Sequence, residues 1–483
     1  MTSDRGRFLL GKRGGTGALL LAALLLAPSL LAVDLPQAPS PEVLRARRER
    51  FLGKLPPRSV AILHSAPERM MSNDTQYLYR QDSDFYYLTG IEEPDTTAVL
   101  RNEPADGKRY LLFVRPRDPR RESYEGPRPG PQGAAARYGA DAAFAESELS
   151  GRLASWDPVT YRFSGYLAEA ERLELSDGND SAWAEKFRAT YRRVRDRDAG
   201  PAIVADAGEV LHEMRLVKDD EEIRLLRRAA EISARGHVLA MKAAAPGKWE
   251  FEIQQALEGY CFANGARRMA YPSIVGSGPD SVFLHWDKND RRMDAGEVVL
   301  DDSGAEYGYY ATDITRTYPV GGRFSAEQRA IYEIVLDAQK QALALVKPGA
   351  RHEEIEQRCA RVQTKGLLRL GLLSGDVETI LKEKAYRRFT LHGVSHWVGL
   401  DVHDRGRYEV GGSSRVLEPG MVFTIEPGVY VPSNAAGVDP KWWNIGVRIE
   451  DTILVTRDGS ECLSCSAPRE IADVEKTVLS GRK

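Results

Sequence analysis

The sequence has few cysteines, few histidines and no excess of either charge. Four cysteines in 483 residues are too few for a disulfide scaffold. Lys and Arg total 67 against 70 Asp and Glu, and this net charge of −3 gives no reason to expect nucleic acid as the main partner. With 42% hydrophobic and 28% charged residues the chain is neither disordered nor fibrous, and its length predicts two domains. Because only eight histidines are present, a cluster of them is informative.

One long hydrophobic run stands near the N-terminus, from Gly17 to Ala32. It follows a basic stretch that ends at Arg13, and at about 16 residues it is shorter than the roughly 20 of a membrane-spanning helix. This pattern predicts a signal peptide over residues 1–32 with cleavage near Ala32, and an uncleaved anchor is the alternative. We therefore expect an exported protein, periplasmic or secreted, with no membrane association after signal cleavage.

The cysteines divide into a pair and two single residues. Cys462 and Cys465 form a C-x-x-C in a loop-like stretch, not after a strand and before a helix as in redox motifs. A local disulfide or two free thiols is therefore expected rather than a redox role. Cys261 and Cys359 lie in helical patterns and are expected in the core.

Strands and helices alternate in the first part of the chain, which predicts an α/β domain over residues 41–208. Residues 41–55 have helical apolar spacing, and buried strands are expected at residues 59–64, 99–100 and 110–114. Residues 115–133 contain many Arg, Pro and Gly residues, and this composition predicts an irregular loop.

Residues 209–483 predict a second, α+β domain. Asp219 and Asp220 are cap candidates for a long helix that begins near residue 218. Further helices are expected over residues 251–262, 326–346 and 352–373. Strands are expected over residues 297–301, 309–318, 421–431 and 445–455.

Four acidic residues stand in these apolar strands. Asp302 ends one strand, Asp313 lies on the next, and the glycine-containing turn between them could set the two carboxylates side by side. Glu426 and Glu450 stand in two later strands. Acids in apolar strands are costly unless they are paired or bind a metal, so a metal site is expected.

Three of the eight histidines, His392, His396 and His403, lie within one short segment. One of them is expected as a ligand, and the other two are either substrate-facing or ordinary core and surface residues. Four carboxylates and one histidine suit Mn²⁺, with Zn²⁺ or Co²⁺ as alternatives, and carry enough charge for two divalent ions. Two such ions can share a bridging hydroxide and polarise a carbonyl, which is hydrolytic chemistry.

Seven segments together resemble the proline-specific aminopeptidases (aminopeptidase P, Xaa-Pro aminopeptidase) of the pita-bread metallopeptidase family, over nearly the whole mature chain. The segments are residues 79–90, 212–215, 273–278, 312–317, 391–404, 425–428 and 448–451. The resemblance implies an α+β pita-bread catalytic domain preceded by a smaller α/β N-terminal domain.

The resemblance also assigns roles to individual residues. It implies that Asp302 holds one metal, that His396 and Glu426 hold the other, and that Asp313 and Glu450 bridge the pair. Glu426 is also expected to take part in proton transfer. The expected substrate-facing residues are His285 and His403, with His392, Tyr430 and Arg448 in the pocket.

The chain departs from the family pattern in two places. Asp302-Ser303-Gly304 stands where the family usually has Asp-Ala-Gly, and Asp301 precedes it as a second candidate acid, although the alignment to Asp313 favours Asp302. Tyr124 stands where many relatives place a Trp.

The resemblance implies hydrolysis of the bond between an N-terminal residue and a following proline, by a hydroxide that bridges two metals. His403 and the metals would stabilise the oxyanion that develops. The expected partners are peptides with proline at the second position, and a homo-oligomer is expected. The alternatives are a prolidase, which takes Xaa-Pro dipeptides, and a non-catalytic pita-bread module that binds peptides.

Overall fold

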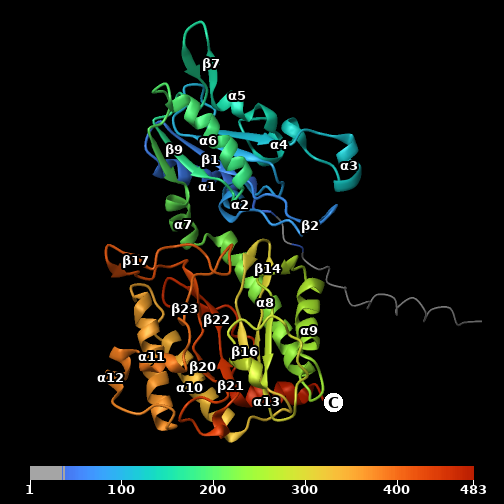
Figure 1. Ribbon diagram of the computed structural model, residues 1–483, viewed down its shortest axis with the longest axis vertical. Helices are drawn as coiled ribbons and strands as arrows, with labels where there is room; N and C mark the ends of the chain where they lie inside the picture. The colour runs from blue at the N-terminus through green and yellow to red at the C-terminus, as the bar shows by residue number, and fades with distance from the viewer. Residues whose placement is uncertain (1–34, 36–37, 483) are drawn as a thin grey trace, which may run out of the picture.

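A computed structural model describes Leu35 and residues 38–482, so the predicted signal peptide lies outside the described residues. No helix among the described residues is long and apolar enough to cross a membrane. Figure 1 shows a smaller N-terminal body above a larger one, with α7 (Gly208–Leu216) between them. The predicted domain boundary therefore falls at the start of α7.

The N-terminal body is built on a mixed six-stranded sheet with the order β10-β9-β1-β4-β5-β6. Its strands are β1 (Ser59–His64), β4 (Thr97–Arg101), β5 (Tyr110–Val114), β6 (Ala142–Ala145), β9 (Arg172–Ser176) and β10 (Ile203–Asp206). The central strand β1 pairs in parallel with β9 and antiparallel with β4. Short hairpins β2–β3 (Met70–Ser72, Thr75–Gln76) and β7–β8 (Ser155–Asp157, Arg162–Ser164) lie outside the sheet.

Helices cover both faces of this sheet because its central strand is apolar on both. Successive side chains of a strand point to opposite faces. Val60 and Ile62 enter one apolar cluster, whereas Ala61 and Leu63 enter another. The first cluster includes residues of α5 (Leu149–Leu153) and α6 (Ser181–Arg195), and the second includes residues of α1 (Pro41–Lys54) and α2 (Ser83–Thr89).

The prediction of an irregular loop over residues 115–133 was wrong. The chain forms α3 (Pro119–Glu125) and then α4 (Gly130–Tyr138). Asp118 caps α3, since its side chain accepts hydrogen bonds from two first-turn amides, and Pro119 occupies the first turn, where no amide hydrogen is needed. In this stretch Pro and Gly mark helix ends rather than a continuous loop.

The larger body places strands between two helix pairs (Figure 1). Helices α8 and α9 pack together on one side, and α10 and α11 pack together on the other. The helices are α8 (Asp220–Ala243), α9 (Glu250–Ala263), α10 (Ala326–Leu343), α11 (His352–Arg369), α12 (Val377–Glu383) and α13 (Ile471–Ser480). The predicted ends of the helices at residues 346 and 373 were therefore a few residues too late.

Short strands fill the space between the helix pairs. Three sheets of three strands are β12-β13-β16 (Ile274–Ser277, Val298–Asp302, Thr315–Pro319), β11-β14-β15 (Arg268–Met269, Ala305–Tyr307, Tyr310–Ala311) and β19-β22-β23 (Val422–Ile425, Asp451–Val455, Ser460–Cys462). Two-stranded ribbons are β20-β21 (Gly428–Val431, Ile445–Arg448) and β17-β18 (Glu409–Val410, Ser413–Ser414).

Three strands that the sequence predicts as continuous are interrupted. The breaks separate β15 from β16, β19 from β20, and β21 from β22. They contain Asp313, Glu426 and Glu450, so the prediction that these three acids lie on strands was wrong. A regular strand would alternate its side chains between two faces, and a break frees each acid from that alternation.

Arg47 of α1 joins the N-terminal body to the start of α8. Its guanidinium Nη2 lies 2.9 Å from Oδ2 of Asp219, the residue that caps α8, and 3.6 Å from Glu222. Breaking a buried ion pair leaves an uncompensated charge, so we expect Arg47→Ala to lower the free energy of unfolding in urea by about 3 kcal/mol. Arg45→Ala, at an exposed position of the same helix, should change it by less than about 0.5 kcal/mol. Equal losses in the two variants would contradict this assignment.

Candidate metal centre

The five residues predicted as metal ligands lie together. One donor atom from each of Asp302, Asp313 and Glu450 falls within 4.8 Å of the others, and so does one from each of His396, Glu426 and Glu450. Glu450 belongs to both groups, so the two groups are adjacent. The structure therefore places together side chains that are up to 148 positions apart in the sequence.

Strand pairing explains how these residues meet. Asp302 ends β13 opposite Thr315 of β16. A Cβ atom at Gly304 would lie 1.9 Å from the carbonyl oxygen of Thr312, so the chain can pass this closely only with glycine there. In the other half Ile425 of β19 pairs with Asp451 of β22, which places the breaks with Glu426 and Glu450 side by side.

His396 completes the cluster from the loop that follows α12. Its Nε2 lies 3.3 Å from Oδ2 of Asp313 and 3.4 Å from Oε1 of Glu426. Its main chain is fixed by Thr424, whose hydroxyl accepts a hydrogen bond from the His396 amide. The imidazole is therefore held against two carboxylates from different strands.

The cluster has the electrostatics of a site built for a cation. Burial raises the pKa of Asp302 to about 6 and that of Glu426 to about 7, and it raises the pKa of Glu450 well above its usual value, with neighbouring carboxylates adding to the shift. Burial would lower the pKa of His396, but Asp313 and Glu426 outweigh it and raise the value to about 9. Oε1 of Glu450 is buried without a hydrogen-bond partner. A divalent cation would satisfy that oxygen and neutralise the crowded carboxylates, so the residues fit a metal.

Comparisons with known proteins agree with this geometry. Residues 224–457 match the metallopeptidase family M24, and residues 44–157 match the aminopeptidase P N-terminal domain. The chain is 39% identical to the Xaa-Pro aminopeptidase of Escherichia coli over 92% of its own length and 99% of that protein. It belongs to metallopeptidase family M24. The Xaa-Pro aminopeptidase of Haemophilus influenzae is 38% identical over 90% of this chain and 96% of its own.

Solved structures extend the family assignment to the whole fold. The aminopeptidase PepP of Pseudomonas aeruginosa matches with a TM-score of 0.87 and 39% identity, over 92% of this chain and 99% of that one. Zn-substituted aminopeptidase P of E. coli in complex with product matches with a TM-score of 0.86 and 38% identity, over 92% of this chain and 100% of that one. The predicted fold, a pita-bread catalytic domain preceded in the chain by an α/β domain, is confirmed. This M24 chain is a hydrolase whose family uses divalent metal.

A cleft opens beside the carboxylate cluster of this M24 chain. Its volume is about 1150 Å³, and residues of both domains line it, including Arg80, Asp82 and Arg215. His396 and His403 also line it, and their rings lie 4.0 Å apart. His403 is exposed, so it can meet a molecule in the cleft. The structure therefore brings one predicted substrate-facing histidine to the open side of the candidate metal centre.

His392, Tyr430 and Arg448 form a hydrogen-bonded chain that reaches the cluster. The Tyr430 hydroxyl lies 2.7 Å from Nε2 of His392 and accepts a hydrogen bond of 2.8 Å from Nη1 of Arg448. Nη2 of Arg448 donates to Asp302 at 2.5 Å. Tyr430 and Arg448 are buried, so the structure places them behind the cluster, and their predicted substrate contact stays a prediction.

His285 is the third predicted pocket histidine. It is exposed and follows the short turn after β12. Its charge helps to lower the pKa of both His392 and His403, after the larger effect of burial, so it faces the same region as these two rings. His285 thus lies near enough to the other two histidines to affect their pKa, and its predicted substrate contact stays a prediction.

Two residues in contact with the carboxylates were not predicted from the sequence. The Tyr271 hydroxyl lies 2.7 Å from Asp302 and 2.5 Å from Asp313. The Thr315 hydroxyl donates to Oε2 of Glu450 at 2.6 Å and accepts from Nε of Arg448. Thr315 could have been found from the sequence, because it stands two positions after the candidate ligand Asp313. Nothing in the sequence marks Tyr271 as a contact of the carboxylates.

The two departures from the family pattern have clear positions. Asp301 points away from the cluster, where it accepts hydrogen bonds from Ser303 and Tyr318, and burial raises its pKa to about 7. It is a structural acid, which leaves Asp302 as the candidate ligand. Tyr124 lies on α3 with an exposed fraction of 85%, and it does not line the cleft.

Proposed function

We propose that this chain is a metal-dependent aminopeptidase that hydrolyses the bond between an N-terminal residue and a following proline. The observation that carries the proposal is the convergence of four carboxylates and one imidazole beside an open cleft. The names of its relatives favour this activity over that of a prolidase, because they are Xaa-Pro aminopeptidases over almost their full length. A non-catalytic module would have no need of such a donor set.

The proposed ligands are Asp302, Asp313, His396, Glu426 and Glu450. They would hold two divalent ions, and the oxygen-rich set favours Mn²⁺, with Zn²⁺ or Co²⁺ as alternatives. When bound, such ions supply an activated water and polarise the scissile carbonyl. Tyr271 and Thr315 would keep the carboxylates turned toward the ions through the hydrogen bonds already described.

The remaining roles follow from position. His403 lies on the cleft side of His396, so its N–H would donate to the oxygen that becomes negative in the transition state. Glu426 contacts both His396 and His392 and would transfer a proton to the leaving amine. His285 and His392 would line the pocket, and Arg448 would hold Asp302 and Tyr430 in place.

Proline selectivity provides the direct test. Proline has no amide hydrogen and a fixed φ, so the site must accept a tertiary amide and fit the ring. We expect kcat/KM for a tripeptide with proline second to exceed that for the matched alanine peptide by at least about a hundredfold. A dipeptide with proline second is assayed in parallel, because a prolidase would cleave the dipeptide and not the tripeptide. Equal values for proline and alanine would refute the proline assignment even if the protein binds metal.

We also propose that the protein is exported, because a basic flank and a short hydrophobic run stand at its N-terminus. N-terminal sequencing of the protein from its native host should find a chain that begins near residue 33. Intact Met1 in a cytoplasmic fraction would refute export.

The predicted homo-oligomer remains a prediction, and light scattering of the purified protein would test it.

A further inference from the structure

A buried ion pair lies directly behind Glu450, on the side away from its carboxylate. Arg316 and Asp451 both have an exposed fraction of 0%, and Nη2 of the arginine lies 2.6 Å from Oδ1 of the aspartate. Oδ2 of Asp451 accepts from Gln339 at 2.9 Å and from Arg469 at 2.8 Å. None of these four side chains has a role in the proposed reaction.

The arginine of this pair, Arg316, also contacts the backbone of the metal centre. Its Nη1 donates to the carbonyl oxygens of Glu450, at 2.5 Å, and Thr315, at 2.9 Å. On its other side, Nη2 donates to the carbonyl oxygen of Ala467 and Nε to that of Pro468, both at 3.1 Å. One guanidinium therefore fixes both the backbone of a proposed metal ligand and the loop over residues 463–468.

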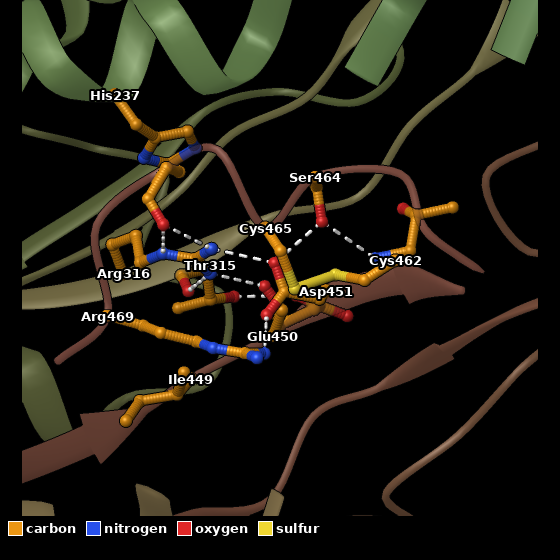
Figure 2. Close-up of polar contacts among 12 residues, drawn as sticks. His237, Thr315, Arg316, Ile449, Glu450, Asp451, Cys462, Ser464, Cys465 and Arg469 are labelled. Atoms are coloured by element: carbon orange, nitrogen blue, oxygen red, sulfur yellow. Dashed lines mark hydrogen bonds and ion pairs between the residues drawn. A yellow bond between two sulfur atoms is a disulfide. The ribbon is translucent and has the colours of Figure 1, made fainter. Parts of the chain in front are cut away.

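A disulfide closes that loop. Cys462 and Cys465 are bonded, so the structure favours the local disulfide over two free thiols. Between them, the buried Ser464 donates to Oδ1 of Asp451 at 2.6 Å and accepts from the amide of Thr452 at 3.0 Å. Figure 2 shows Asp451 between Arg316 and the disulfide loop. The two cysteines are half-buried, so a small reductant can reach them.

We propose that the Cys462–Cys465 disulfide and Ser464 act as positioning residues for Glu450 through Asp451 and Arg316, which makes metal binding and turnover depend on the oxidation state of this cysteine pair. The proposal rests on the proposed role of Glu450 as a metal ligand. Residues that orient metal ligands from behind typically change metal affinity or activity by 10–100-fold when they are replaced.

Reduction of the Cys462–Cys465 disulfide is the change that should weaken this support of Glu450. A dithiol donates two electrons and two protons and leaves as its own cyclic disulfide, while the S–S bond breaks and Cys462 and Cys465 each become a thiol. Reduction removes the covalent bond that closes this loop, so the loop loses a constraint on the position of the Ser464 hydroxyl relative to Asp451. The disulfide closes only a very short loop and constrains the unfolded chain less than a long one would, so the effect should be local.

The test compares the oxidised enzyme, the reduced enzyme and the double variant Cys462→Ser/Cys465→Ser. After treatment with dithiol, desalting without oxygen and addition of Mn²⁺, the reduced enzyme should bind Mn²⁺ about tenfold more weakly and turn over a proline tripeptide about tenfold more slowly. KM should change little, and reoxidation should restore both values. The double variant should show the same losses, and dithiol should have no further effect on it, which controls for chelation of metal by the reductant.

A second pair of variants tests the route through Ser464. Ser464→Ala should reproduce the loss of Mn²⁺ affinity, whereas Ser464→Thr, which keeps the hydroxyl, should restore most of it. If the folded double variant and Ser464→Ala both bind Mn²⁺ and turn over like the oxidised enzyme, the inference is wrong. If the oxidised wild type itself has no metal-dependent activity on proline peptides, the proposed function has failed instead.

Discussion

Replacing Asp313 with Ala is expected to lower kcat/KM on a proline tripeptide by at least about a thousandfold, because metal assistance contributes several kcal/mol to such a barrier. Asp313 contacts both His396 and Tyr271 and belongs to the group that shares Glu450, so its loss removes a donor from the centre of the cluster. Elemental analysis after dialysis should find less metal than in wild type, and steady-state kinetics gives the loss of turnover.

The same variant should still fold. His396 keeps Glu426 as a partner at 3.4 Å when Asp313 is lost, so the metal-free variant should unfold cooperatively, with a Tm close to or a little below that of the metal-free wild type. Added Mn²⁺ should raise the Tm of the wild type and leave that of the variant almost unchanged, since a ligand stabilises only a protein that binds it. Asp458→Ala, at an exposed position, should behave as wild type. A variant that keeps two metals and full turnover would contradict the ligand assignment.

The sequence predicted the helices of the larger domain because their signals are local. The apolar spacing and the capping residue Asp219 place the start of α8 within two residues, and Ser325 caps α10 in the same way. The strand breaks at Asp313 and Glu450 left no such mark, whereas the break at Glu426 was marked by Pro427, which cannot donate to a strand ladder. An apolar run around an acid reads the same whether the strand continues or stops, because the partner that decides between them lies elsewhere in the chain.

The candidate acidic ligands could be predicted from the sequence because a buried acid in an apolar segment is stable only when it is paired or bound to a metal. Their supporting residues could not. The hydroxyl of Thr315 meets Glu450 across 135 positions, and Arg316 meets Asp451 across the same separation. The C-x-x-C pair was detectable, but its position beside Asp451 depends on the pairing of β22 with β23, which no local pattern encodes.

His403 should matter for turnover more than for binding. Its ring lies 4.0 Å from that of His396 on the open side of the cluster, where it would meet charge that appears only in the transition state. Burial and the neighbouring His396 lower its pKa, which favours the neutral imidazole, and this form carries one N–H to donate. We expect His403→Ala to lower kcat by about a hundredfold, the size seen when one oxyanion donor is removed.

The metal content and the KM of His403→Ala should stay close to those of the wild type, since none of the proposed ligands is changed. His403→Gln keeps an N–H donor on a side chain of similar length, so its loss of kcat should be smaller than that of the alanine variant. His403→Leu fills a similar space without an N–H donor, so it should lose as much kcat as the alanine variant if His403 is an oxyanion donor, and little if His403 only fills space. If His403→Ala instead raises KM and leaves kcat unchanged, the histidine binds the substrate in its ground state, and the negative oxygen is stabilised by other groups.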